Sequence, residues 1–206
     1  EAYEDFDQFL MRLSHEKRKK IRQERRKVRE AGIEMHRLTG EQIHEDDWDF
    51  FARCYEGTYF AHHSRPYLNL SFFKRLVSTM PENLLLVVAK KNGVPLASAL
   101  NIYSNSALYG RYWGCVEYVP NLHFEACYYQ AIDFAIRRGL KRVEAGAQGE
   151  HKIQRGYLPV ATYSAHWITD PGFRRAVDDF LKRERPAMEQ EIEALMQYSP
   201  FRKDGE

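Results

Sequence analysis

The pattern of apolar and polar positions along the chain changes its period several times, which predicts a definite order of helices and strands. Apolar side chains at three- and four-residue steps over residues 3–13 predict a short amphipathic helix. Residues 15–30 hold nine Lys or Arg and only two apolar positions that form a seam, Ile21 and Val28. We therefore expect a basic helix that turns these two residues toward the body, keeps most of its cations in solvent and ends at Gly32.

The rest of the chain alternates helical and strand-like runs. Asn92-Gly93 lies between two strand-like runs and is a strong signal for a tight hairpin. Gly139 follows a run with helical spacing and is its expected end. The expected elements are a strand at 33–38, helices at 40–55 and 71–80, strands at 83–91, 94–103 and 107–114, a helix at 122–138, strands at 141–145 and 161–168, and a helix at 171–197 with Pro186 as its candidate break.

This order predicts an α/β fold with a mixed, mainly antiparallel sheet and flanking helices. The three runs between 83 and 114 form an antiparallel meander, whereas a single helix joins the last of them to 141–145, so these two strands should be parallel neighbours. A sheet that changes from antiparallel to parallel tends to open at that point, and ligands favour such openings. We expect three regions: an N-terminal helical segment over 1–32, the α/β domain over 33–170, and a C-terminal helix and tail over 171–206.

Composition narrows the class of protein. The 206 residues carry a net charge of +2, so the overall charge does not demand a nucleic-acid partner. Three cysteines without CxxC spacing argue against disulfides and a zinc site, and favour a reducing, cytoplasmic setting. The longest apolar run, 84–89, is far shorter than the roughly 20 residues of a membrane helix. We therefore expect no membrane span. His62-His63 has no Cys or carboxylate at ligand spacing, so we expect no metal site either.

The segment from Glu144 to Tyr157 is the strongest candidate for a functional site. It packs three glycines, two carboxylates and several cations directly after a strand, where glycine lets the backbone approach a ligand and charged groups can converge. The alternative is a structural turn with solvated charges, in which Glu144 pairs with Arg142 or Lys141. The catalytic candidates are Glu144, His151 and Tyr157, with Glu150 as a further base, and the substrate-binding candidates are Gln148, Lys152 and Arg155.

Two residues outside this segment have both a functional and a structural interpretation. Arg111 stands beside the expected opening of the sheet, where it can bind a phosphate or stack on one of its aromatic neighbours, and we count it among the substrate-binding candidates. His166 lies in the strand expected at 161–168 and should be a core or edge histidine. If the segment is the site, its His, Lys, Arg and Tyr side chains should line one cavity, with Glu144 at the floor, near Arg111 and the start of the helix at 122–138.

The run from Tyr128 to Gly146, continued by Lys152-Ile-Gln-Arg-Gly-Tyr157, resembles the second acyltransferase-like domain of the Fem-type peptidoglycan aminoacyltransferases, within the acyl-CoA N-acyltransferase (GNAT) superfamily. In that domain a helix, a strand ending in glycine and a Lys-containing segment before Gly-Phe recur in this order. The form Gly146-Ala-Gln-Gly-Glu-His-Lys152, with Tyr163-Ser-Ala-His166, more specifically resembles the bacterial FemAB-like family. The resemblance covers about residues 12–170 and implies a GNAT-like fold.

The resemblance also implies an activity. Fem-type relatives suggest an acyl- or aminoacyl-transferase acting on an amine in peptidoglycan or cell-envelope assembly, with acyl-CoA or aminoacyl-tRNA as donor and a small-molecule or muropeptide-type acceptor. They also imply that a first acyltransferase-like domain precedes the basic helix and is missing here. Acetyl-CoA users carry Gly or Ala where Arg111-Tyr-Trp-Gly-Cys-Val116 ends in Val, and a β-branched residue hinders close approach to a pyrophosphate. This departure weighs against acetyl-CoA.

Two other interpretations stay open. A non-catalytic GNAT-like module would bind a peptidoglycan-type or other anionic ligand through the same cations, but needs no base in an open pocket. An RNA-binding protein is the third interpretation and rests on the basic helix alone. Cations packed this densely cost stability unless an anionic partner, such as tRNA or a phosphate-bearing precursor, offsets them.

Overall fold

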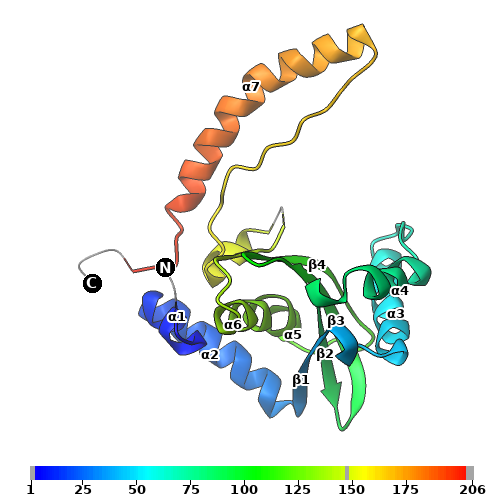
Figure 1. Ribbon diagram of the computed structural model, residues 1–206. Helices are drawn as coiled ribbons and strands as arrows, with labels where there is room; N and C mark the ends of the chain where they lie inside the picture. Colours follow the sequence, from blue (N-terminus) through cyan, green and yellow to red (C-terminus); the bar gives the residue numbers. More distant parts are fainter. Residues whose placement is uncertain (1–2, 147–148, 203–206) are drawn as a thin grey trace. The chain divides into compact units, whose positions relative to one another are not determined.

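Five strands form one sheet in the order β1-β2-β3-β4-β5 in the computed structural model, which describes residues 3–146 and 149–202 (Figure 1). The first four strands pair antiparallel with their neighbours, and β5 pairs parallel with β4. The expected meander and the parallel fifth strand are therefore confirmed. The strands are β1 Ile33–Thr39, β2 Leu84–Lys91, β3 Val94–Tyr103, β4 Ala107–Cys115 and β5 Arg142–Glu144.

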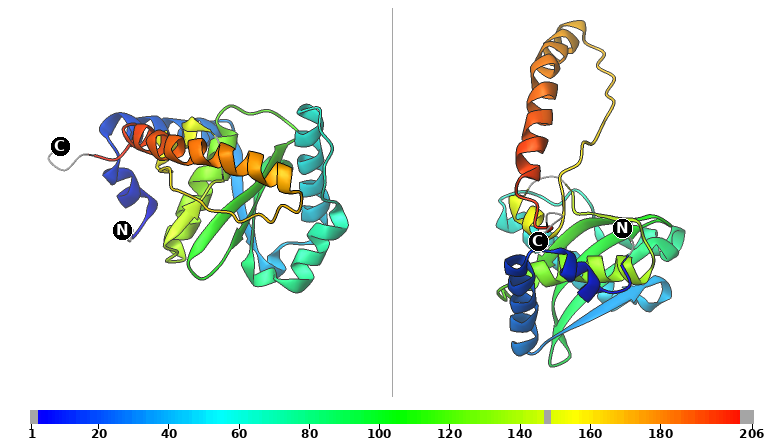
Figure 2. Two further views of the ribbon diagram at one scale, coloured as in Figure 1. Left: turned by 90° about the horizontal axis from the view of Figure 1, so that it is seen from above. Right: turned by 90° about the vertical axis from the view of Figure 1, so that its left-hand side faces the viewer.

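Helices cover both faces of the sheet. They are α1 Phe6–Arg12, α2 His15–Glu30, η1 Gly40–Gln42, α3 Glu45–Ala61, α4 Leu70–Thr79, η2 Pro81–Asn83, α5 Leu122–Phe124, the π turn η3 Glu125–Tyr129, α6 Gln130–Arg137, η4 Glu150–Arg155 and α7 Pro171–Met196. Figure 2 shows α3 and α4 on one face of the sheet and α6 on the other. Contacts divide the chain into two compact units, Glu1–Gln148 and Gly149–Glu206, so the division falls inside the range 33–170 that we assigned to one domain.

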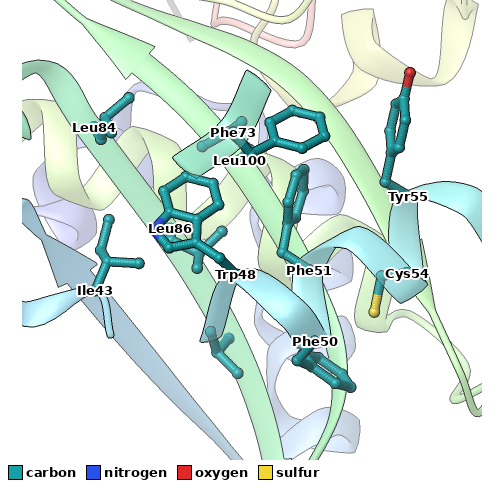
Figure 3. Packing of buried hydrophobic residues seen from close by; sticks show 11 residues of the cluster. Ile43, Trp48, Phe50, Phe51, Cys54, Tyr55, Phe73, Leu84, Leu86 and Leu100 are labelled. Carbon is teal, nitrogen blue, oxygen red and sulfur yellow. The ribbon is translucent and has the colours of Figure 1, made fainter. Parts of the chain in front are cut away.

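The inner strand β2 contributes side chains to the core on both faces of the sheet. Its side chains alternate between the two faces, and both faces are covered, so the strand reads as an uninterrupted apolar run. Leu84, Leu86 and Val88 pack with aromatic residues of α3 and α4, as Figure 3 shows for part of this cluster. Leu85 and Val87 pack on the opposite face with residues of η3 and α6. Asn92 and Gly93 both have positive φ, 51° and 80°, which fits the tight hairpin expected between β2 and β3.

Helix α2 is held to the body by more than its apolar seam. Ile21 and Val28 are buried as expected, and Glu24 is buried between them. The guanidinium of Arg25 forms a bidentate ion pair with the carboxylate of Glu125 on η3, with both shortest N–O distances at 3.1 Å. The basic helix therefore has a structural face, and most of its other cations point to solvent.

Three expected elements differ from the structure. The helix expected at 40–55 begins only at Glu45 and continues to Ala61, because Thr39 and Gln42 form a capping box around the short turn η1. The strand expected at 161–168 is absent from the described part of the chain, where residues 158–170 form neither strand nor helix. His166 is correspondingly exposed and lies 2.9 Å from the Ser164 hydroxyl, so the interpretation of a core or edge histidine is wrong. Helix α7 runs through Pro186 without a break.

Candidate functional site

The parallel pairing of β4 with β5 ends early, and beyond it this edge of β4 has no strand partner among the residues that the structure describes. The register runs from Ala107 opposite Arg142 to Tyr109 opposite Glu144, where β5 stops, whereas β4 continues to Cys115. On the other side of β4 the register passes from Tyr112 opposite Leu100 to Gly110 opposite Asn101. Arg111 is therefore the extra residue of a β-bulge, a feature that often re-aims side chains beside active sites.

Arg111 lies at this bulge with its guanidinium 5.7 Å from the centre of the Tyr112 ring. The hydroxyls of Tyr112 and Tyr67 are 2.7 Å apart. Burial raises the pKa of Tyr112 to about 12, whereas the hydrogen bond to Tyr112 holds the pKa of Tyr67 below its ordinary value. The stacking interpretation of Arg111 is met by this cation–π contact. The side chain is also exposed, so an anion can reach it.

Glu144 is the last residue of β5 and pairs with a neighbour on its own strand. Its carboxylate lies 3.2 Å from Nε of Arg142, and both side chains are partly exposed. This ion pair is the structural alternative to a catalytic role for Glu144. Pairs of this kind in solvent contribute little stability, so the carboxylate is held only weakly.

Four other candidates lie in the second unit, on or next to the turn η4. Arg155 is buried and donates a hydrogen bond from Nη1 to the carbonyl oxygen of His151 at 2.8 Å. The backbone N–H of Tyr157 donates to the carbonyl of Lys152 at 3.2 Å. A Cβ at Gly149, which has φ of 96°, would stand 2.7 Å from the ring of His151. The turn thus carries the candidates His151, Lys152 and Arg155 within six residues, and Arg155 supports its backbone. Gln148 lies outside the described residues.

The charge state of His151 suits a proton acceptor. Partial burial lowers the pKa of His151, and the neighbouring cations of Arg155 and Lys152 lower it further. A lowered pKa keeps the imidazole neutral at neutral pH, which is the form that can take a proton from an amine.

Gly114, in the segment compared with acetyl-CoA binding motifs, has a packing role. A Cβ at this position would stand 2.0 Å from the carbonyl oxygen of Cys54 on α3. Thr58 on the same helix donates a hydrogen bond to the carbonyl of Trp113 at 2.8 Å. The glycine is therefore needed for the close approach of α3 to β4, and its presence alone is no sign of a pyrophosphate site.

Asn101 is a residue that our sequence interpretation missed. It lies on β3 opposite Gly110, is 1% exposed, and its Nδ2 has no hydrogen-bond partner among the residues that the structure describes. Buried amide donors are normally satisfied, so such a group calls for an explanation. The signal was available: Asn101 is the one strongly polar side chain inside the apolar run of β3.

Two classes of site find no support. No three His, Cys, Asp or Glu gather into a possible metal site within residues 3–146 and 149–202. None of the helices in the same ranges combines the length and the apolar character needed to cross a membrane.

The sheet order, the parallel fifth strand and the early end of β5 give a GNAT-like fold, and similar solved structures were found. The chain is similar to a GCN5-related N-acetyltransferase from Ralstonia eutropha JMP134, with a TM-score of 0.50 and 17% identity over 66% of this chain and 99% of that one. It is also similar to the C-terminal domain of a protein described as a lysylphosphatidylglycerol synthetase from Agrobacterium fabrum, with a TM-score of 0.49 and 14% identity over 66% of this chain and 44% of that one. A ribosomal-protein-alanine N-acetyltransferase from Brucella melitensis gives a TM-score of 0.45 and 15% identity over 67% of this chain and 99% of that one. At 17% identity the likeness to the Ralstonia protein shows the fold alone.

The chain belongs to the FemAB-like family, whose description is peptidoglycan biosynthesis and recognition and whose model matches residues 1–203. No significant match to the chain is found among curated proteins. The resemblance drawn from the residues around Gly146 is thereby confirmed.

Proposed function

We propose that the chain is an acyl- or aminoacyl-transferase that acts on an amine of a peptidoglycan-type or muropeptide-type substrate. The observation that carries the proposal is the edge of β4 beyond Tyr109, which has no pairing with β5 and holds the bulged Arg111. Backbone N–H groups on such an edge can donate to an acyl carbonyl oxygen, and preorganised donors of this kind stabilise the negative charge that develops there. The family description, which names peptidoglycan, supports the choice of acceptor.

The reaction assigns a role to each candidate. The amine nitrogen attacks the acyl carbonyl, the new amide bond forms, and the bond to the CoA sulfur or the tRNA ribose oxygen breaks. Each unit offers its own set of groups for this step, and the two sets are alternatives. In the second unit His151 takes the proton that the amine loses, and Lys152 and Tyr157 donate to the oxyanion. In the first unit Glu144 is the base, the free edge of β4 donates to the oxyanion, and Arg111 binds an anionic part of a substrate. In either case the leaving group regains a proton.

Of the two donor classes, acetyl-CoA has the weaker support. Val116 occupies the place where Gly or Ala would let the backbone approach a pyrophosphate, and Gly114 is required by the packing of α3. An aminoacyl ester needs no such approach, so aminoacyl-tRNA is the donor to test first, followed by longer acyl-CoAs.

A non-catalytic module that recognises a peptidoglycan-type anionic ligand is the second candidate. Two observations favour it: Glu144 is paired with Arg142, and Arg155 supports the backbone of its own turn. The family description also includes recognition.

Transfer assays with two variant pairs test the proposal. His151→Ala and Lys152→Ala probe the second unit, and Arg111→Ala and Glu144→Gln probe the first. His166→Ala is the control because that histidine is exposed and its ring contacts the Ser164 hydroxyl. Mass spectrometry follows transfer from aminoacyl-tRNA or acyl-CoA to a muropeptide amine. We expect His151→Ala to lose about 10²-fold or more in rate with little change in melting temperature.

The pH profile provides a second readout. Because the pKa of His151 is lowered, the rate should fall only as the pH drops below the ordinary histidine value of about 6.5, and Lys152→Ala should move the midpoint up. If only one variant pair loses turnover, the chemistry belongs to that unit. Binding of muropeptide without transfer from any donor would favour the recognition module.

A further inference from the structure

A strongly basic groove of about 970 Å³ lies in the first unit between α1, α2 and α6. Figure 1 shows α1 beside the start of α2, with α6 next to α2. The lining contains six arginines and one lysine but only three aspartates. The groove therefore concentrates positive charge in a recess, although the whole chain has a net charge of only +2. A charged recess of this kind focuses its field on ligands of opposite sign.

Part of this charge is already neutralised, and the remainder identifies the ligand-binding groups. Arg22 pairs with Asp7 at 3.1 Å, and Arg25 pairs with the buried Glu125. By contrast Arg18, Lys19 and Arg29 have no carboxylate within 4.0 Å among the residues described here. The guanidinium of Arg18 rests instead 3.3 Å from the sulfur of Met11. These three cations are the ones that an anionic ligand would neutralise.

The cations are held in place before any ligand arrives. Ile21 and Val28 bury the opposite side of α2, and the guanidinium of Arg25 lies 4.4 Å from the ring centre of Phe6 on α1 as well as against Glu125. A row of charges on a helix fixed in this way loses little backbone freedom on binding, which lowers the cost of association.

The length of the row selects the kind of ligand. Arg18 and Arg29 are three turns apart on α2, or about 16 Å at the usual helical rise. A single diphosphate would engage one turn of this row, whereas a strand with a phosphate on every unit can follow all of it. A membrane surface is flat and would meet the rim of the recess rather than its lining. We propose that this groove binds the sugar–phosphate backbone of a nucleic acid strand, and that RNA is its ligand. The inference rests on the groove alone and stands whether or not the chain transfers an acyl group.

A pair of charge reversals with equal total charge tests the proposal on the full chain. Arg18→Glu with Arg29→Glu changes two cations of the groove, and Lys20→Glu with Lys27→Glu changes two exposed cations of the same helix outside it. Fluorescence anisotropy with a labelled RNA of about twelve nucleotides measures binding between about 50 and 200 mM salt. We expect the groove variant to bind at least about tenfold more weakly and its salt slope to fall by about 1.4, because two phosphate contacts are lost. The control variant should stay within about threefold of the unchanged chain.

Several results would overturn the proposal. They are equal losses in both variants, absence of binding at low salt, and displacement of the RNA by inorganic pyrophosphate at equal molar concentration. Groove-dependent binding to phosphatidylserine vesicles in place of RNA would assign the groove to a membrane and would also reject it. Circular dichroism melting of both variants shows whether they are folded, and transfer activity is measured separately, so loss of RNA binding and failure of the transferase proposal are distinguishable.

Discussion

At the scale of single residues, glycine has different functions at different places in this chain. Gly114 stands where β4 and α3 touch, and a side chain there would overlap the carbonyl of Cys54 at 2.0 Å. Gly57 lies on the exposed side of the same helix α3, and a Cβ there would meet nothing within 4 Å. A side chain is therefore excluded at Gly114 but has room at Gly57.

Replacing each of these glycines with alanine should change stability in opposite directions. Gly114→Ala overpacks the contact between β4 and α3, and we expect it to lower the free energy of unfolding by at least about 2 kcal/mol. Gly57→Ala removes backbone freedom from the unfolded chain at a helical position with open space, and we expect a gain of about 0.5–1 kcal/mol. Urea unfolding measures both. Equal effects of the two changes would show that α3 and β4 are not in this close contact.

At the scale of elements, the attachment of α2 depends on a polar contact under the π turn η3. Glu125 on η3 is 4% exposed, accepts the bidentate pair from Arg25, and receives a further hydrogen bond from Nε2 of Gln130 at 2.7 Å. A buried carboxylate with several partners becomes costly when one of them is removed. On the solvent side, Arg26 pairs with Glu30 at 3.5 Å, with both side chains more than half exposed.

Methionine at each of these two arginines compares the buried and the exposed pair on one helix. We expect Arg25→Met to lower the free energy of unfolding by about 3 kcal/mol or more, since it leaves Glu125 buried without its cation. Arg26→Met should change it by less than about 0.5 kcal/mol. Chemical denaturation of both variants is the measurement. A small loss for Arg25→Met would mean that the apolar seam alone holds α2.

At the scale of the whole molecule, the two units differ in how their backbone is organised. The first unit contains the sheet and its covering helices, whereas residues 158–170 of the second unit form an extended run without regular structure. Tyr163 and Trp167 in this run are 94% and 85% exposed. Exposed, extended chain is the preferred substrate of proteases.

Brief digestion of the native protein with chymotrypsin should therefore cut first after Tyr163 or Trp167. Mass spectrometry identifies the first fragments, and a chain with Ser at both positions should be cut several-fold more slowly. A first cut within β2 or β3 would contradict this organisation, because those strands are paired on both sides over most of their length.

Local patterns predicted most elements because their causes are local. Asn92-Gly93 adopts the positive φ values that its hairpin needs, Gly139 ends α6, and the seam of Ile21 and Val28 faces the body. The strand expected at 161–168 failed for a different reason. A strand is stable only with a partner for its backbone groups, and alternation of side chains cannot supply one.

Side chains of the candidate site were predicted less completely than the fold. The sequence indicated Arg111, His151, Lys152 and their neighbours as candidates, and their chemical roles stay predictions. It did not show that Arg111 occupies a bulge, that Arg155 is buried on its own turn, or that Nδ2 of Asn101 is buried without a partner in the described part of the chain, because each depends on register or burial.

By itself the sequence determined the order of helices and strands, the parallel placement of the fifth strand and membership of the family, since periodicity, turn residues and crossover handedness act over short stretches of chain. Only the tertiary structure decided how charges are shared. The guanidinium of Arg25 forms an ion pair with the buried Glu125, whereas Arg18 and Arg29 on the same helix line the basic groove. These residues are alike in the sequence, and their difference comes from which side of α2 packs against the body and what lies opposite.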